Sequence, residues 1–144
     1  MMDDIIKLMY EKYVYFANMM SKANYTPAIA SGEVALLLFL YVGGMGLAVY
    51  NLPLEGPLLI VHLYGAILVT ITAFGLLAAS FRYGNKGLML ISLLNVIFVL
   101  YAAFMGSFYF SGVTDPSYLL AMGMGFVGAL FSATGCIIYA IRRG

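Results

Sequence analysis

Four long apolar segments limit what this chain can fold into more than any other feature. They lie at about 33–52, 57–80, 86–110 and 116–141, and each is near the ~20 residues that a helix needs to cross a ~30 Å hydrocarbon core. Of the 144 residues, 64% are hydrophobic and only 9% are charged. A soluble fold of this length has too little interior to bury so much apolar surface. The sequence therefore predicts that lipid surrounds most of the chain.

Short polar turns separate the four segments. Pro57 suits the first residue of a helix, and Gly84-Asn85 predicts the end of one helix followed by the cap of the next. Asp115-Pro116 predicts a cap and a first-turn proline in the same way. Because short loops join consecutive helices, neighbouring helices should be antiparallel. We therefore predict an all-α integral membrane protein, an up-down four-helix bundle over residues 33–144.

The first 24 residues have a different pattern, in which apolar side chains recur every three or four positions. This spacing predicts an amphipathic helix over 1–24, which either lies in the membrane interface or docks on a partner subunit. Residues 25–32 are expected to be a linker, because the residue before Pro27 is disfavoured in a helix. The apolar face of the amphipathic helix consists of Met2, Ile5, Met9, Tyr13, Phe16 and Met20.

The basic residues predict how the bundle is oriented. All seven fall on one side of the predicted spans, whereas the two opposite loops carry only Glu55 and Asp115. By the positive-inside rule, both termini are expected in the cytoplasm. The net charge of +1 gives no general attraction to nucleic acid. The basic residues are Lys7, Lys12, Lys22, Arg82, Lys86, Arg142 and Arg143.

His62, the single histidine, lies inside the second apolar segment. It follows Pro57 by five residues, which places it about 7–8 Å inside the membrane boundary at about 1.5 Å per residue. An ionisable side chain within a span is by default a functional hypothesis. Gly65 and Ala66 would leave room beside the imidazole for a flat ligand. We therefore predict that His62 is the residue nearest to any chemistry.

Methionines are candidate partners of His62. Histidine with methionine holds haem in some cytochromes, and imidazole with thioethers suits copper(I), so haem b or copper could bind here. No second histidine is present, which excludes bis-histidine haem ligation within one chain. The preferred alternative is a neutral histidine among packing methionines, because methionine makes up 10 of 144 residues. The methionines expected at the depth of His62 are Met45, Met105, Met122 and Met124.

Other polar residues within the spans are candidates for packing or transport. Glu33 is expected at the edge of the first span, where the helix dipole favours a carboxylate. The alternative is that Glu33 takes part in transport. Asn95 and Thr72 are predicted to meet near mid-membrane. An interhelical hydrogen bond is the ordinary use of such a pair, with substrate binding as the alternative.

The last span is rich in small residues, which let membrane helices approach closely. One stripe consists of Ala121, Gly125, Ala129 and Ala133, and an adjacent stripe consists of Gly128, Ser132 and Cys136. One stripe suffices for packing inside the bundle, so two stripes suggest contact with a second protein. Cys136 is the single cysteine and has no partner within the chain for a disulfide.

No catalytic constellation and no phosphate-binding loop is apparent in the sequence. The expected function is therefore an accessory or structural subunit of a larger membrane complex. If that complex is energy-transducing, His62 would be the residue nearest to its chemistry. Such a protein would have lipid and other membrane subunits, or further copies of itself, as partners. One alternative is a haem- or copper-binding electron-transfer or quinone-site subunit that uses His62. Another is a small oligomeric transporter that uses Glu33, Asn95 and His62.

Overall fold

The computed structural model describes residues 6–7, 9–12, 25–49, 56–112 and 115–143. Four helices make up the bundle: α2 (Thr26–Val49), α3 (Pro57–Tyr83), α4 (Lys86–Phe110) and α5 (Pro116–Arg143). The described residues contain no strand. All four helices are long and apolar enough to cross a membrane. The protein is thus all-α, and its four candidate spans indicate a multi-pass membrane protein.

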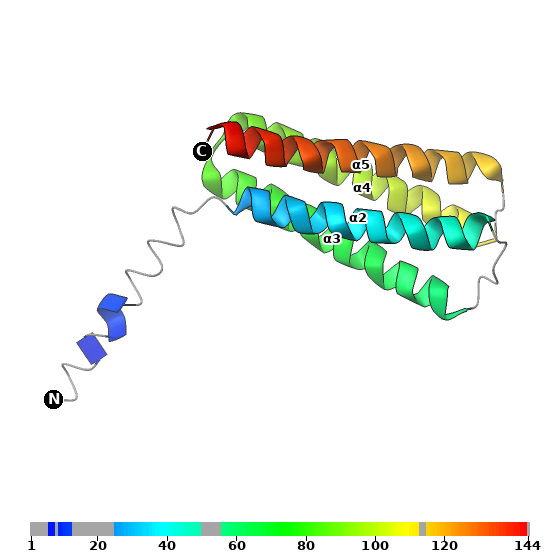
Figure 1. Ribbon diagram of the computed structural model, residues 1–144, viewed down its shortest axis with the longest axis horizontal. Helices are drawn as coiled ribbons and strands as arrows, with labels where there is room; N and C mark the ends of the chain where they lie inside the picture. The colour runs from blue at the N-terminus through cyan, green and yellow to red at the C-terminus, as the bar shows by residue number, and fades with distance from the viewer. Residues whose placement is uncertain (1–5, 8, 13–24, 50–55, 113–114, 144) are drawn as a thin grey trace.

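The helices run up and down and form a ring (Figure 1). α2 packs against α3 and α5, and α4 packs against α3 and α5, with the most extensive contact between α4 and α5. We call the end that contains the α3–α4 turn and the C-terminal end of α5 the basic end, because Arg82, Lys86 and Arg142 lie there. The opposite end, where α3 and α5 begin, is the distal end. Toward the distal end, α3 leans away from the other three helices (Figure 1).

The turn between α3 and α4 confirms the sequence prediction. Gly84 ends α3 with φ 75° in the left-handed region, where glycine carries no side-chain penalty. Asn85 then caps α4, because its side-chain oxygen accepts hydrogen bonds from the backbone N–H groups of Gly87 at 2.9 Å and Leu88 at 3.3 Å. Asp115 does the same before α5, accepting from the N–H of Ser117 at 2.8 Å. Local sequence therefore determines these helix ends.

The start of α2 corrects the predicted boundary. The helix begins at Thr26, so residues 25–32 are helical from the second residue onward, and the linker prediction is wrong there. Pro27 lies in the first turn, where a missing N–H breaks no helical hydrogen bond. Glu33 is therefore seven residues inside the helix, about 10 Å along its axis.

Only part of the predicted amphipathic helix is described. Residues 6–7 and 9–12 are helical, and the rest of 1–24 lies outside the described residues. The interfacial role of this segment stays a prediction.

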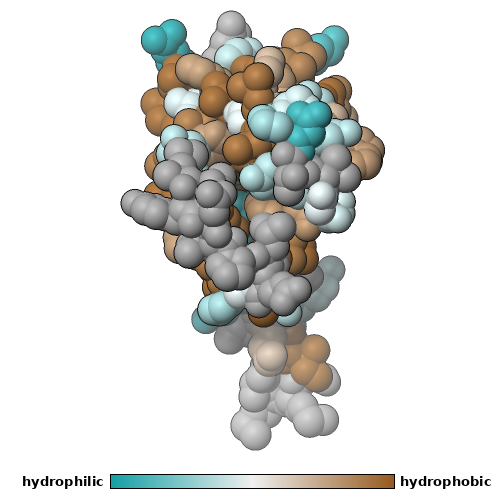
Figure 2. Space-filling view, turned by 90° about the vertical axis from the view of Figure 1, so that its right-hand side faces the viewer, coloured by the Kyte–Doolittle hydropathy of each residue, from teal (hydrophilic) through white to brown (hydrophobic). Residues whose placement is uncertain are grey.

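The outer surface of the bundle is strongly apolar. Val42, Leu120 and Phe131 are 72%, 69% and 74% exposed. Apolar residues cover much of the described surface seen from the distal end (Figure 2). Exposed large side chains on all four helices favour lipid over water as the surrounding medium.

Small residues in α5 bring the helices close together inside the bundle. A Cβ atom added at Gly125 would lie 2.8 Å from the backbone nitrogen of Ala102, and one at Gly128 would meet the ring of Phe98. Ala129 and Ala133 have no exposed surface, Ser132 is 8% exposed, and Ala121 is half-buried. Both predicted stripes thus have neighbours within this chain, so they do not require a second protein.

Two apolar clusters form the core. One contains Leu37, Val69, Ala73, Val96, Val99 and Ala129. The other is nearer the basic end and contains Ala30, Leu76, Leu88, Cys136 and Ala140. Buried polar side chains lie between these clusters along three helices.

Candidate functional site

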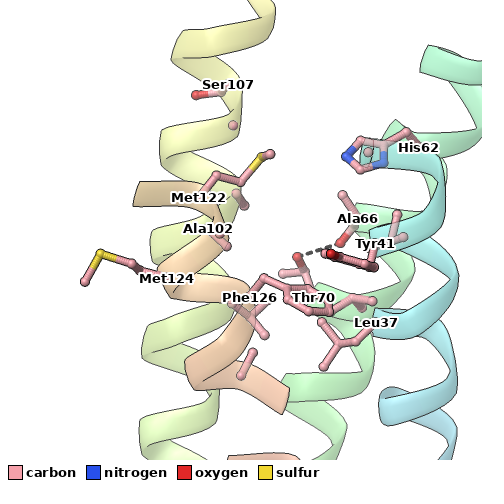
Figure 3. Close-up of a pocket in the computed structure, with 18 of the residues that line it drawn as sticks. Leu37, Tyr41, His62, Ala66, Thr70, Ala102, Ser107, Met122, Met124 and Phe126 are labelled. Carbon is pink, nitrogen blue, oxygen red and sulfur yellow. Dashed lines mark hydrogen bonds between the residues drawn. The ribbon is translucent and has the colours of Figure 1, made fainter. Parts of the chain in front are cut away.

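The distal half of the bundle contains a cavity of about 1290 Å³ that is partly open to the outside and is lined by residues of all four helices (Figure 3). Its lining is almost entirely apolar. The buried side chains of Leu37, Val99 and Ala129 mark its end toward the basic end, and we call these three residues the floor. Because α3 leans away from α4 and α5 here, side chains do not fill the space between the helices.

His62 projects from α3 into this cavity (Figure 3). Its imidazole lies against two glycines of α2. A Cβ atom added at Gly44 would be 3.1 Å from Cε1, and one at Gly43 would be 3.7 Å from Nδ1. The ring of Phe110 lies on another side, with 5.5 Å between ring centroids. The Gly43-Gly44 pair thus provides the room in which the imidazole sits.

The two ring nitrogens of His62 have different surroundings. Nδ1 is buried and has no hydrogen-bond partner among the described residues. A neutral imidazole carries its proton on one nitrogen only, and that proton is stabilised where it meets an acceptor. Because Nδ1 is enclosed against α2, we assign the proton to Nε2 at the cavity side. His62 can then donate a hydrogen bond to a bound molecule.

The threonine and serine hydroxyl groups around the cavity donate their protons to carbonyl groups of their own helices. Thr70 donates to the carbonyl of Ala66 at 2.8 Å (Figure 3), and Ser107 donates to the carbonyl of Phe104 at 2.7 Å. Such back-bonding is usual for hydroxyl side chains in membrane helices. His62 and the hydroxyl of Tyr41 therefore remain as side-chain donors that line the cavity.

The structure brings one of the four predicted methionines toward His62. Met122 and Met124 both line the cavity, but the side chain of Met122 points to the side on which His62 lies, whereas that of Met124 is 64% exposed and points away from His62 (Figure 3). Met105 does not line the cavity, and the side chain of Met45 lies outside the described residues. Within the described part of the chain, no group of three His, Cys, Asp or Glu side chains could hold a metal ion.

A second polar group lies below the floor. Asn95 Nδ2 donates to Glu33 Oε1 at 2.5 Å, and the Ser132 hydroxyl donates to Asn95 Oδ1 at 3.1 Å. Glu33 and Asn95 have no exposed surface. We call these three residues the polar cluster. It joins α2, α4 and α5.

The polar cluster corrects the partner predicted for Asn95. Thr72 donates to the backbone carbonyls of Leu68 and Val69, and no hydrogen bond joins it to Asn95 among the described residues. A threonine hydroxyl can reach the carbonyl one turn earlier in its own helix, so it does not need a partner on another helix. The predicted Asn95–Thr72 pair is therefore wrong.

Sequence reasoning also missed Glu33 as a member of this group. The predicted linker placed it at the start of a helix, whereas it lies about 10 Å inside α2. Its second oxygen, Oε2, is buried and has no hydrogen-bond partner in the described part of the chain. A helix start at Thr26 would have placed Glu33 near the depth of Asn95. The matching depth of Glu33 and Asn95 could therefore have revealed their hydrogen bond.

Comparison with known proteins gives no assignment: no family model, no curated protein and no solved structure matches this chain. Two features of the molecule therefore bear on its function: the cavity with His62 and the buried polar cluster.

Proposed function

We propose that this protein is a membrane subunit that binds a lipid-soluble molecule in the cavity, with an acceptor oxygen of the headgroup at His62 Nε2. The observation that carries the proposal is the position of His62, with Nδ1 enclosed and its ring directed into an apolar cavity of about 1290 Å³. Small-molecule sites are typically apolar, with a few placed polar groups, and measure about 300–1,000 Å³. This cavity would hold a headgroup and part of a hydrocarbon tail.

The lining favours a neutral, flat headgroup with a carbonyl oxygen. Among the described residues, Tyr41 is the one ionisable side chain besides His62 that lines the cavity, so a charged headgroup would lose its hydration without a partner. Tyr41 is already stacked on Phe126, with 5.3 Å between ring centroids. The planar ring of Phe110 beside His62 offers an aromatic surface. A quinone combines these properties: a flat ring, carbonyl acceptors and an apolar tail.

The single histidine makes the proposal directly testable. In protein labelled with ¹⁵N-histidine and reconstituted in lipid nanodiscs, the two side-chain nitrogen signals belong to His62 alone. A short-tailed quinone should shift the Nε2 signal and leave Nδ1 nearly unchanged. His62→Leu should weaken quinone binding about tenfold or more, because a lost buried hydrogen bond is worth about 1–3 kcal/mol.

Matched variants distinguish quinone binding in the cavity from a haem or copper site that uses His62 and a methionine. Ala66→Leu narrows the cavity and should reduce binding, whereas Met122→Leu keeps a similar volume and should leave quinone binding unchanged. Binding that is indifferent to both His62→Leu and Ala66→Leu would refute the proposal. A haem or copper site would instead give a reduced-minus-oxidised absorption band that both His62→Leu and Met122→Leu remove.

The orientation and the partners belong to the same proposal. The basic residues favour cytoplasmic termini, which places the cavity in the outer half of the membrane. Asp115→Cys should then react with an impermeant thiol reagent added to intact cells, and Arg82→Cys only after permeabilisation; the reverse pattern would invert the orientation. The accessory role predicts that gentle detergent extraction recovers other membrane subunits in a fixed ratio, and recovery of the chain alone would count against it.

A further inference from the structure

Among the residues that the structure describes, no positive partner lies beside the buried carboxyl group of Glu33. The basic side chains described in the bundle, Arg82, Lys86 and Arg142, are exposed at the basic end. Glu33 lies about 10 Å inside α2, with no exposed surface. A lone carboxylate in a low-dielectric interior is strongly disfavoured, and such a group takes up a proton instead.

The helices around Glu33 offer no group that could balance a negative charge. Within their spans, α3 from residue 66 to 81 and α4 from residue 87 to 100 contain no titratable side chain. From α5, the titratable groups on this side are Cys136, which is fully buried, and Tyr139 near the basic end. A thiol and a phenol never carry a positive charge, so neither compensates a carboxylate.

We infer that Glu33 is a proton-binding site, built by Asn95 and Ser132 beneath the cavity. Asn95 Nδ2 donates to Oε1 at 2.5 Å, which leaves Oε2, the buried oxygen without a partner, to carry the proton. The Ser132 hydroxyl donates to Asn95 Oδ1 at 3.1 Å and shares its proton with the Gly128 carbonyl at 2.6 Å. This contact turns the NH₂ group of Asn95 toward Glu33, so the cluster is ordered to hold a neutral carboxyl group.

The position of the cluster links this proton to the cavity. The floor residues Leu37 and Val99 follow Glu33 and Asn95 by four residues each, which is about 6 Å along a helix. Ala129 precedes Ser132 by three residues on the antiparallel α5. One apolar layer therefore separates the carboxyl group from the cavity. A movement of α2 against α4 and α5 that parts this layer would let the proton exchange with the cavity.

Infrared spectroscopy of the full chain in lipid vesicles tests the inference whether or not a ligand occupies the cavity. At neutral pH we expect a carbonyl-stretch band from a protonated carboxylic acid. Glu33→Gln should remove this band, and the exposed control Glu11→Gln should keep it. Asn95→Leu should move the band to higher frequency, because the carbonyl loses its hydrogen-bond donor.

The experiment remains decisive if a variant does not fold. The chain has three glutamates among its six acidic residues, so labelling glutamate with ¹³C in the unmodified protein should shift the band. No such band at neutral pH, or a band retained in folded Glu33→Gln, overturns the inference. A carboxylate band that moves when sodium is replaced by choline would also overturn it, and would assign the site to a metal cation. Failure of quinone binding would leave this result unaffected.

Discussion

The basic half and the distal half of the bundle use the same four helices in opposite ways. In the basic half, small side chains such as Ala133 and Cys136 have no exposed surface, and the helices close completely around the polar cluster. In the distal half, the Gly43-Gly44 pair faces the imidazole of His62 and not a helix backbone, and α3 leans away. A small residue that faces another helix lets the two helices pack closely, whereas a small residue that faces a large side chain leaves room for that side chain.

The polar side chains differ between the halves in a parallel way. In the basic half, Glu33, Asn95 and Ser132 bond to one another across three helices. In the distal half, Thr70 and Ser107 bond within their own helices, and His62 Nδ1 has no partner. Hydrogen bonds between helices stabilise the basic half, whereas the distal half keeps the imidazole Nε2 of His62 available for a ligand. We therefore expect stability to depend mainly on the basic half and ligand binding on the distal half.

The largest expected effect on the free energy of unfolding comes from placing leucine at an alanine in the basic half, and the same substitution in the distal half serves as its comparison. Ala133→Leu inserts a large side chain where no exposed surface remains, and overpacking of this kind costs about 3 kcal/mol of unfolding free energy. Ala66→Leu places the same side chain at the cavity, where it should cost little or even stabilise. Unfolding by SDS titration in mild detergent, followed by circular dichroism, measures both. Equal losses of unfolding free energy in the two variants would show that the two halves are packed equally tightly.

Removing a hydrogen bond of the polar cluster should cause the next largest loss of unfolding free energy. Asn95→Leu leaves Glu33 with no hydrogen bond in the interior, and an unsatisfied buried group costs about 1–3 kcal/mol. The double variant Glu33→Leu with Asn95→Leu removes both partners and should recover most of this loss, because an apolar pair needs no partner. The same unfolding assay applies. A double variant as unstable as Asn95→Leu would show that packing, and not the unpaired carboxyl group, caused the loss.

The smallest effect is expected at the turn before α5, outside the spans. The pKa of Asp115 lies below its ordinary value of 3.8, chiefly because the backbone N–H of Ser117 donates to the carboxylate. A depressed folded-state pKa adds stability above the unfolded-state pKa, and this stability is lost as the pH falls through the folded-state value. The thermal midpoint of the wild type should therefore fall slightly on acidification, whereas that of Asp115→Asn should lack this component.

The sequence predicted the helices better than the contacts between them. Gly84, Asn85 and Asp115 mark helix ends by local hydrogen bonds, so the bounds of α4 agree with the prediction at both ends. The start of α2 was predicted wrongly because proline was taken as a break, although a first turn tolerates it. That error placed Glu33 at a helix end. Local chemistry determines helix ends, but the depth of a residue depends on where its helix begins.

The contacts of the candidate sites depend on three-dimensional features that residue spacing does not contain. Matching depth correctly identified Asn95 as a mid-span polar residue, but the rotation of each helix decides whether Thr72 or Glu33 faces it. In the same way, the position of His62 was readable from its segment, whereas the lean of α3 that creates the cavity was not. Of the methionines at similar depth, rotation about the helix axis turns Met122 toward His62 and Met124 away from it (Figure 3).

The single cysteine gives the unmodified protein an internal reporter. Cys136 is free and fully buried in the basic half, in the cluster that also contains Ala30 of α2. A thiol reagent can modify it only during moments when the helices separate. The labelling rate of the native chain therefore counts these openings, with no introduced probe to disturb them.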